Sequence, residues 1–212
     1  MRFLDRLAGG DRTRMERLGA AIGYDITHRR FQQNSPVIAG TPGEVAECLL
    51  PHLPGTTPAA LITRMNATAA TAPQVEAVPL TPLLGRLRSR GVRLGVATND
   101  AEGPARAHLA SAGVIDLFDF IVGFDSGFGA KPQPGQLLGF AEAMGLNSSS
   151  VVMVGDSRHD LLAARAAGMR PVAVLTGIAS EAELAPLSEV VLTDINALPD
   201  WIDAAQQTVD AA

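Results

Sequence analysis

The sequence places a hydroxyl, an amide, an ammonium group and two carboxylates just after three short apolar segments. Carboxylate oxygens are the ligands that a hard cation such as Mg²⁺ prefers, and a lysine supplies a compact positive charge for phosphate oxygens. The hydroxyl and nearby backbone N–H groups add neutral hydrogen-bond donors. The set is therefore suited to binding a phosphoryl group together with a divalent cation. Its members are Thr98, Asn99, Lys131, Asp156 and Asp160.

The segments that carry these side chains belong to an alternation of strands and helices that begins near residue 80. Short apolar runs are typical of buried strands, and the stretches between them end in glycines, which are typical of helix C-termini. This alternation predicts an α/β fold with a parallel sheet covered by helices on both faces. Such sheets bind ligands at the carboxyl ends of their strands, so we expect the five side chains to meet at one edge. The predicted strands span 92–99, 118–124, 151–155, 171–177 and 190–192, and the predicted helices span 81–91, 103–112, 134–144 and 158–167.

The part of the chain before residue 80 has a different character, and no convincing strand pattern occurs before residue 90. Thr41 and Glu44 form a capping box, which predicts a helix that begins there. Apolar side chains at helical spacing predict two further helices, over 12–22 and 59–70. The pattern thus predicts two domains, an α-helical one at 1–79 and an α/β one at 80–212.

The composition is that of an acidic globular protein. The 212 residues carry a net charge of −5 and are 47% apolar, so the chain is long and apolar enough to bury a core. Aromatic residues make up only 4%, which together with the negative charge argues against nucleic-acid binding. The sequence contains no apolar leader and no apolar run of membrane-spanning length, and Cys48 has no second cysteine to pair with. We therefore expect a cytoplasmic protein that binds neither nucleic acid nor membrane.

Each of the five side chains also has a purely structural interpretation. Thr98 and Asn99 are of types that commonly end a strand. Asp156 and Asp160 are of a type that caps a helix or faces its dipole. Lys131 is one of 17 cations, yet it is the only lysine, because the other 16 are arginines. A site that contacts a phosphate and a carboxylate together favours a compact ammonium, so the order and context of the five residues favour the functional interpretation.

Three ordered segments resemble motifs of the haloacid dehalogenase superfamily, in particular of its phosphoglycolate-phosphatase-like members. Val96-Ala97-Thr98-Asn99 is similar to the second motif, Gly129-Ala130-Lys131-Pro132-Gln133-Pro134 to the third, and Val151–Met169 to the fourth. The resemblance is close over residues 80–178. It is looser over residues 1–79, where it implies an α-helical cap beside a Rossmann-like core.

The resemblance implies a Mg²⁺-dependent phosphatase that acts on a small phosphorylated metabolite, such as 2-phosphoglycolate, through a phosphoaspartyl intermediate. By the matching positions, Thr98 and Asn99 would bind the substrate, with the Thr98 hydroxyl donating to a phosphoryl oxygen. Lys131 would neutralise charge on the phosphate and on the nucleophile. Asp156 would bind Mg²⁺, and Asp160 would support the metal directly or through water. The cap would close over the site and set its specificity.

The first motif of the family, an Asp-x-Asp segment at the end of the first, central strand, has no counterpart in the 212 residues. Its first aspartate is the nucleophile and its second the general acid/base, so we expect a core without its central strand and a chain that is inactive and poorly stable as written. Three explanations are open: a longer enzyme whose recorded start lies too far downstream, a truncated inactive paralogue, or a module that binds phosphorylated ligand or a protein partner without turnover. The undisturbed spacing of the other motifs favours the first. Asp100 is a second departure, because many relatives carry a lysine after Thr-Asn.

Overall fold

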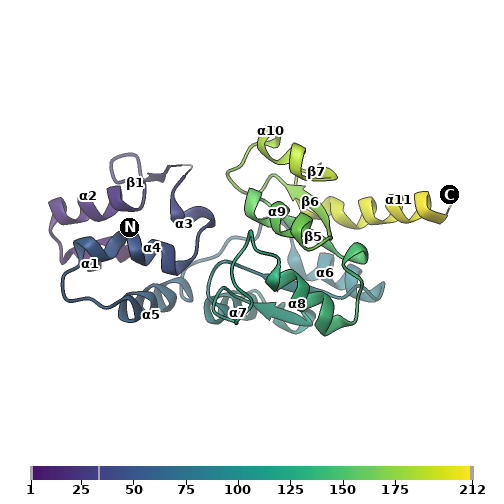
Figure 1. The fold of residues 1–212 in the computed structure, drawn as a ribbon, viewed down its shortest axis with the longest axis horizontal. Helices are drawn as coiled ribbons and strands as arrows, with labels where there is room; N and C mark the ends of the chain where they lie inside the picture. The colour runs from purple at the N-terminus through teal and green to yellow at the C-terminus, as the bar shows by residue number, and fades with distance from the viewer. Residues whose placement is uncertain (1, 33, 211–212) are drawn as a thin grey trace.

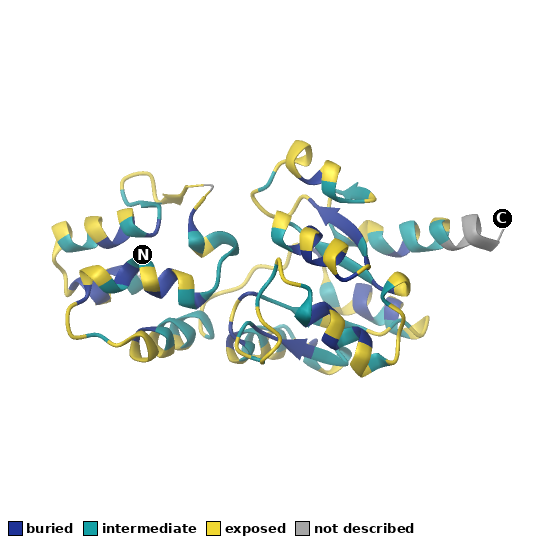
Figure 2. Cartoon of the chain, viewed as in Figure 1, coloured by how far each residue is buried: buried dark blue, intermediate teal, exposed yellow. Residues whose placement is uncertain are grey.

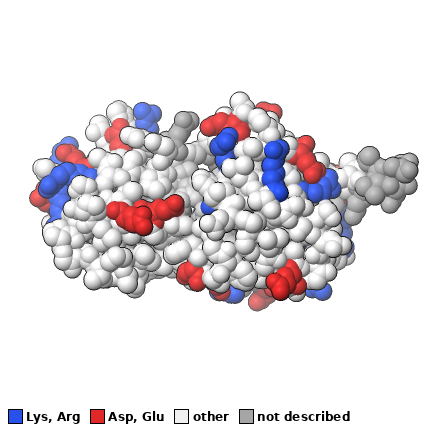
Figure 3. All heavy atoms as spheres, in the orientation of Figure 1, with Lys and Arg blue, Asp and Glu red and all other residues white. Residues whose placement is uncertain are grey.

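The structure is a computed structural model that describes residues 2–32 and 34–210, and it has two lobes (Figure 1). The first lobe is helical and ends with α5 (Pro58–Ala69), and the second begins with α6 (Leu80–Ser89) and contains the parallel strands. The segment 70–79 connects them. In the described part of the chain, no helix is long and apolar enough to cross a membrane. On the face drawn in Figure 3, basic and acidic side chains occur in small groups of both signs.

The helical lobe packs its helices around one apolar core, whose buried faces are dark blue in Figure 2. Its other helices are α1 (Arg2–Ala8), α2 (Arg12–Ala21), α3 (Pro36–Ala39) and α4 (Pro42–Leu49). The predicted helices over 12–22 and 59–70 are confirmed as α2 and α5. Leu18, Leu49 and Leu61, from α2, α4 and α5, are each 0% exposed and belong to the same cluster. Burial of these side chains therefore holds three helices together.

The predicted capping box at the start of α4 is confirmed. The Glu44 N–H donates to Thr41 Oγ1 at 3.2 Å, and the Thr41 N–H donates to Glu44 Oε2 at 2.6 Å. Both hydrogen bonds satisfy backbone donors that a helix start leaves without an intrahelical partner. The start of α4 is thus fixed by its local sequence.

The expectation that no strand occurs before residue 90 is wrong. Strands β1 (Tyr24–Asp25) and β2 (Arg30–Phe31) form an antiparallel hairpin. Each has only two residues, which is too short to show the alternation of apolar and polar side chains by which a strand is recognised. Arg29 in the turn has φ of 54°, a left-handed conformation that closes the hairpin and that arginine seldom adopts. Neither feature has a distinctive sequence signal.

The second lobe confirms the α/β class but not the single sheet. Its strands are β3 (Gly95–Ala97), β4 (Phe120–Val122), β5 (Val152–Gly155), β6 (Arg170–Val174) and β7 (Val190–Leu192). All five predicted strands are present, and those predicted at 92–99, 118–124 and 171–177 are shorter than expected. Every pairing is parallel, but the strands form two sheets, β3–β4 and β5–β6–β7.

Helices surround both sheets (Figure 1). The α-helices that follow α6 are α7 (Glu102–Ser111), α8 (Gly135–Met144), α9 (Arg158–Ala166), α10 (Glu181–Leu184) and α11 (Leu198–Asp210). Single 3₁₀ turns occupy Leu50–His52, Ile115–Leu117, Ser148–Ser150, Ala185–Leu187 and Ile195–Ala197. The four helices predicted in this lobe are confirmed to within two residues at either end.

The division into two sheets leaves β3 and β5 each paired on one side only among the described strands. All four residues of β5 are only partly buried, whereas residues 171–174 of the neighbouring β6 are buried. An apolar strand with a free edge is able to pair with another strand. The sheets are separate because no described strand lies between β3 and β5.

Asp119, just before β4, ties that strand to the segment leading into β3. Its carboxylate accepts hydrogen bonds from the Leu94 N–H at 3.0 Å and from Arg93 Nη1 at 3.1 Å, and it also pairs with Arg88. The Leu94 N–H bond contributes most to holding the pKa of Asp119 below its ordinary value, and the two guanidinium groups lower it further. Because the native pKa is lowered, the ionised carboxylate stabilises the fold above its unfolded pKa, and this stabilisation is lost as pH falls through the native pKa.

Replacing Asp119 with asparagine is expected to lower the free energy of unfolding at pH 7 by about 1–3 kcal/mol, because hydrogen bonds to a charged acceptor are lost. Urea denaturation measures this difference, which should shrink below about pH 4 as the carboxyl group of the unsubstituted chain becomes protonated. Asp200→Asn is the matched control, since the Asp200 side chain is 76% exposed in its pair with Arg86. Equal effects of the two substitutions at pH 7 would contradict the role assigned to Asp119.

Candidate active site

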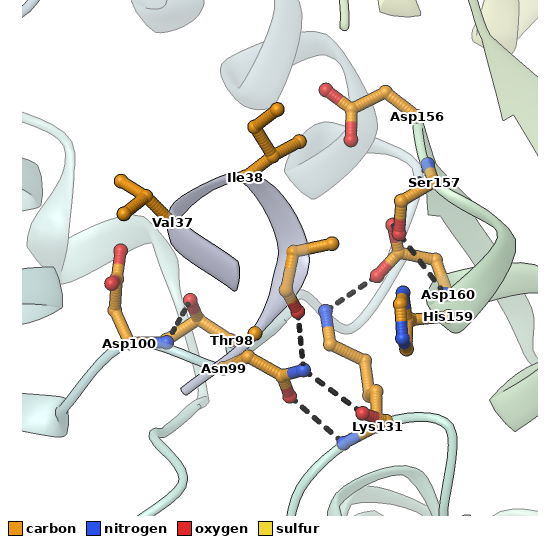
Figure 4. A pocket seen from close by; sticks show the side chains of 12 residues that line it. Val37, Ile38, Thr98, Asn99, Asp100, Lys131, Asp156, Ser157, His159 and Asp160 are labelled. Atoms are coloured by element: carbon orange, nitrogen blue, oxygen red, sulfur yellow. Dashed lines mark hydrogen bonds and ion pairs between the residues drawn. The ribbon is translucent and has the colours of Figure 1, made fainter. Parts of the chain in front are cut away.

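A cavity of about 180 Å³ opens where the carboxyl ends of β3 and β5 meet the tip of the helical lobe (Figure 4). All five side chains singled out from the sequence line it, so the structure brings them together as expected from the strand ends. The helical lobe contributes one wall, made by α3 and Gly40. The lining residues are 37–40, 98–100, 131, 156, 157, 159 and 160.

Thr98 follows β3 directly and presents its hydroxyl to the cavity. The Thr98 N–H donates to Val122 O at 3.1 Å, continuing the pairing of β3 with β4. Its Oγ1 accepts from the Asp100 N–H at 3.0 Å, and a hydroxyl that accepts one hydrogen bond still has its proton to donate. Gln136 Nε2 donates to Thr98 O at 3.0 Å, so the backbone that carries this hydroxyl is held from both sides.

The Lys131 side chain bridges the ends of the two sheets. Its Nζ donates to Ala97 O, at the end of β3, at 2.6 Å and to Asp160 Oδ1, on the helix after β5, at 2.5 Å. Both charged side chains are 9% exposed, so this is a buried ion pair. An ammonium group has three donors, and these two contacts leave a third for a ligand in the cavity.

Asp160 combines a structural and an electrostatic role. Its Oδ2 accepts from the Ser157 N–H at 3.1 Å and from Ser157 Oγ at 2.7 Å, and Ser157 Oγ accepts from the Asp160 N–H at 3.4 Å. These bonds form a capping box at the start of α9, which agrees with the structural interpretation of this carboxylate. Since Oδ1 pairs with Lys131 and Oδ2 with Ser157, Asp160 fixes the loop and the ammonium at the same time.

The Asp156 carboxylate forms no hydrogen bond or ion pair with another described side chain and points into the cavity (Figure 4). Burial raises its pKa above the ordinary value, and the negative charge of Asp160 raises it further. A partly buried carboxylate beside a second one is the environment that a bound divalent cation would stabilise. Within residues 2–32 and 34–210, no group of three or more His, Cys, Asp or Glu side chains is placed to hold a metal ion. Mg²⁺ is commonly bound through one or two carboxylates and keeps several waters, so Asp156 and Asp160 are the cavity residues that could hold such an ion.

Two glycines make room for the carboxylates. A Cβ on Gly155 would lie 2.2 Å from Asp160 Cβ, and a Cβ on Gly177 would lie 2.6 Å from Asp156 Oδ2. Real Cβ atoms do not approach so closely, so any side chain at either position would displace a carboxylate. The absence of a side chain at Gly155 and at Gly177 thus leaves the space that the carboxylates of Asp160 and Asp156 occupy.

Several residues of the site were not predicted from the sequence. The wall formed by Val37 and Ile38 belongs to α3, a helix of one turn whose only signal is Ser35 before a proline. Gln136 is 0% exposed and donates to both Thr98 O and Gly129 O, which joins the loop after β3 to the loop of Lys131. Its Oε1 is buried with no hydrogen-bond partner. A glutamine at the start of a helix has no pattern that reveals such a bridge.

Comparison with known proteins shows what the chain is similar to. The family model for haloacid dehalogenase-like hydrolases matches residues 55–174, which include all five site residues. A phosphoglycolate phosphatase from Rhodospirillum rubrum is 41% identical over 125 residues, which are 58% of this chain and 52% of that protein. The chain spans about half the length of the curated relatives it matches.

Solved structures share the fold over most of the chain. A β-phosphoglucomutase from Clostridium difficile superposes with a TM-score of 0.70 at 18% identity and covers 94% of this chain and 91% of that chain. A haloacid dehalogenase family hydrolase from Deinococcus radiodurans R1 was solved with bound phosphate and sodium. It is 26% identical, superposes with a TM-score of 0.59, and covers 70% of this chain and 67% of that chain. The arrangement of helices and parallel strands is therefore one that these proteins have in common.

Proposed function

The chain belongs to the haloacid dehalogenase-like hydrolase family, and on that premise we propose that it is a Mg²⁺-dependent phosphatase of small phosphomonoesters such as 2-phosphoglycolate. The observation that carries the proposal is the buried Lys131 ammonium, held between Ala97 O and Asp160 and facing a cavity that Thr98 and Asp156 also line. Fixed positive charge, a hydroxyl donor and carboxylates for a cation are the groups that phosphoryl transfer requires.

The phosphoryl group would lie between β3 and β5. Thr98 Oγ would donate to one phosphoryl oxygen, and the third N–H of Lys131 would donate to another. Asp156 would hold Mg²⁺, whose contribution when bound is to offset the negative charge of the phosphate and the carboxylates. The side chains of Val37 and Ile38, on the opposite wall, would contact the rest of the substrate and keep water from it.

The nucleophile is proposed to be an aspartate that lies outside the described residues. No Asp-x-Asp segment occurs in the sequence. Among the described strands, β3 and β5 each have an unpaired edge, neither contains a buried residue, and both end at the cavity. A parallel strand between them would join the two sheets into one. Its carboxyl end would bring an aspartate next to Lys131 Nζ, which would neutralise that carboxylate.

The reaction would then proceed by two displacements at phosphorus. The aspartate oxygen forms a bond to phosphorus while the bond to the ester oxygen breaks, and the alcohol leaves with a proton from the second aspartate of the motif. Water, deprotonated by the same aspartate, next attacks phosphorus and breaks the acyl phosphate bond, which releases inorganic phosphate. Lys131 and Thr98 stabilise the charge on the equatorial oxygens in both steps.

Phosphate release from a panel of phosphomonoesters, with Mg²⁺ or with EDTA, tests this proposal. The 212-residue chain is expected to show no turnover, whereas a chain extended at its N-terminus by an apolar strand ending in Asp-x-Asp should hydrolyse 2-phosphoglycolate only with Mg²⁺. The matched control carries asparagine in place of the first aspartate of the extension and should be inactive. Turnover by the unextended chain near the typical enzymatic rate of about 10 s⁻¹ would contradict the assigned nucleophile. An extended chain that binds phosphate without turnover would instead support a phosphate-binding module.

A further inference from the structure

One side chain in the cavity contacts the helical lobe and the Lys131 loop at the same time. Asn99 Nδ2 donates to Ala39 O, at the end of α3, at 2.9 Å and to Lys131 O at 2.9 Å, while Asn99 Oδ1 accepts from the Lys131 N–H at 2.8 Å (Figure 4). The residue is 9% exposed. Both amide protons of Asn99 are therefore directed to protein carbonyls.

The contact with Ala39 falls on the C-terminal end of α3. At the other end of this helix, Ser35 Oγ donates to Ile22 O at 2.5 Å and accepts from the Val37 N–H at 3.2 Å, which anchors the helix to its own lobe. The last carbonyls of a helix have no intrahelical donors. Asn99 satisfies one of them from the other lobe, and so acts as a C-terminal cap for the helix that forms one wall of the cavity.

We propose that Asn99 is a positioning residue that couples closure of the helical lobe to the placement of Lys131. When the lobe moves away, Ala39 O leaves and a buried amide donor loses its partner, which disfavours the bonds by which the same side chain orients the Lys131 backbone. A closed lobe and a correctly placed ammonium therefore stabilise each other. The relevance of this coupling to catalysis rests on the proposed function, but the coupling itself does not.

The composition offers a simple way to observe the coupling. Lys131 is the only lysine, so a chain labelled with ¹⁵N-lysine gives a single backbone amide signal, from the N–H that donates to Asn99. Hydrogen exchange of residues 36–40 reports on the helical lobe in the same sample. His108→Ala is the matched control, because His108 Nε2 makes a second bond between the lobes, to Ala69 O at 2.7 Å, without contacting Lys131.

Asn99→Ala is expected to speed exchange both at the Lys131 amide and over residues 36–40 by about tenfold. His108→Ala should leave the Lys131 amide unchanged. Asn99→Asp, which preserves the size and the Oδ1 acceptor, serves as a second variant in case the alanine variant does not fold. It should speed exchange over residues 36–40 and, because the released lobe no longer stabilises the Lys131 loop, at the Lys131 amide as well, although the Oδ1 acceptor is preserved.

Slow exchange of the Lys131 amide in either variant, or of residues 36–40 in Asn99→Asp, would overturn the proposal. Adding inorganic phosphate with Mg²⁺ distinguishes a failure of the Asn99 proposal from a failure of the proposed function. If phosphate leaves the Lys131 signal of the unsubstituted chain unchanged, the proposed function fails, whereas the exchange results still decide the role of Asn99. A substrate-binding role alone for Asn99 predicts that none of these exchange rates changes before phosphate is added.

Discussion

Replacing Lys131 with methionine is expected to lower the free energy of unfolding at pH 7 by about 3–5 kcal/mol, because the Asp160 carboxylate is left buried without its partner. Both side chains of the pair are 9% exposed, so the carboxylate is poorly hydrated once the ammonium is removed. The same substitution should weaken binding of inorganic phosphate by about 10–100-fold, through loss of a charged donor. Chemical denaturation measures the first effect, and isothermal titration calorimetry measures the second.

The double variant Lys131→Met/Asp160→Asn separates the buried charge from the lost contact. Asparagine preserves an acceptor for Ser157 but carries no charge, so most of the stability should return while phosphate binding stays weak. Arg106→Met is the control for a surface pair, since the Arg106 side chain is 48% exposed beside Glu102, and it should cost at most about 1 kcal/mol. A cost for Lys131→Met no larger than that control would contradict the buried pair.

The second large effect is expected at Asp156, where one substitution should weaken metal binding and at the same time raise stability. Burial and the neighbouring Asp160 raise the pKa of Asp156, so its ionised form is disfavoured in the folded chain at neutral pH. Asp156→Asn should therefore raise the melting temperature in EDTA. It should also weaken Mg²⁺ binding at least about 100-fold, because the direct ligand is lost.

Differential scanning calorimetry with EDTA and with Mg²⁺ measures both parts of this prediction. Mg²⁺ should raise the melting temperature of the unsubstituted chain and leave that of Asp156→Asn unchanged. Asp100→Asn is the matched control, because Asp100 lines the same cavity but is exposed, and it should keep the response to Mg²⁺. An Asp156→Asn variant that Mg²⁺ stabilises as much as the unsubstituted chain would refute the metal assignment.

The features that the sequence predicts well are those with a local physical cause. The capping box at Thr41 lies within four residues, so the start of α4 is predicted correctly. The strand before Asp156 is an apolar run bounded by polar residues, and its prediction is correct to within one residue. The rule that ligands meet at the carboxyl ends of parallel strands then brings Thr98, Lys131 and Asp156 to one cavity. Spacing along the chain was sufficient for this part of the site.

The features that the sequence does not reveal depend on partners distant in the chain. The separation of β3–β4 from β5–β6–β7 follows from which strands are available to pair, and no property of β3 alone shows it. The α3 wall and the bonds of Asn99 to Ala39 and Lys131 join residues 60 and 32 positions apart. The packing of the two lobes creates the contact with Ala39, and the packing of two loops of the second lobe creates the contact with Lys131, so no local pattern predicts either.

Titration of the 212-residue chain with inorganic phosphate, with and without Mg²⁺, tests the central claim most directly, because it needs no substitution and no added strand. Phosphate and Mg²⁺ would occupy the same cavity with opposite charges, so each should tighten binding of the other by the same factor. The account predicts one phosphate per chain, bound several-fold more tightly when Mg²⁺ is present. Absence of phosphate binding at millimolar concentration, or binding that is the same in EDTA, would contradict it.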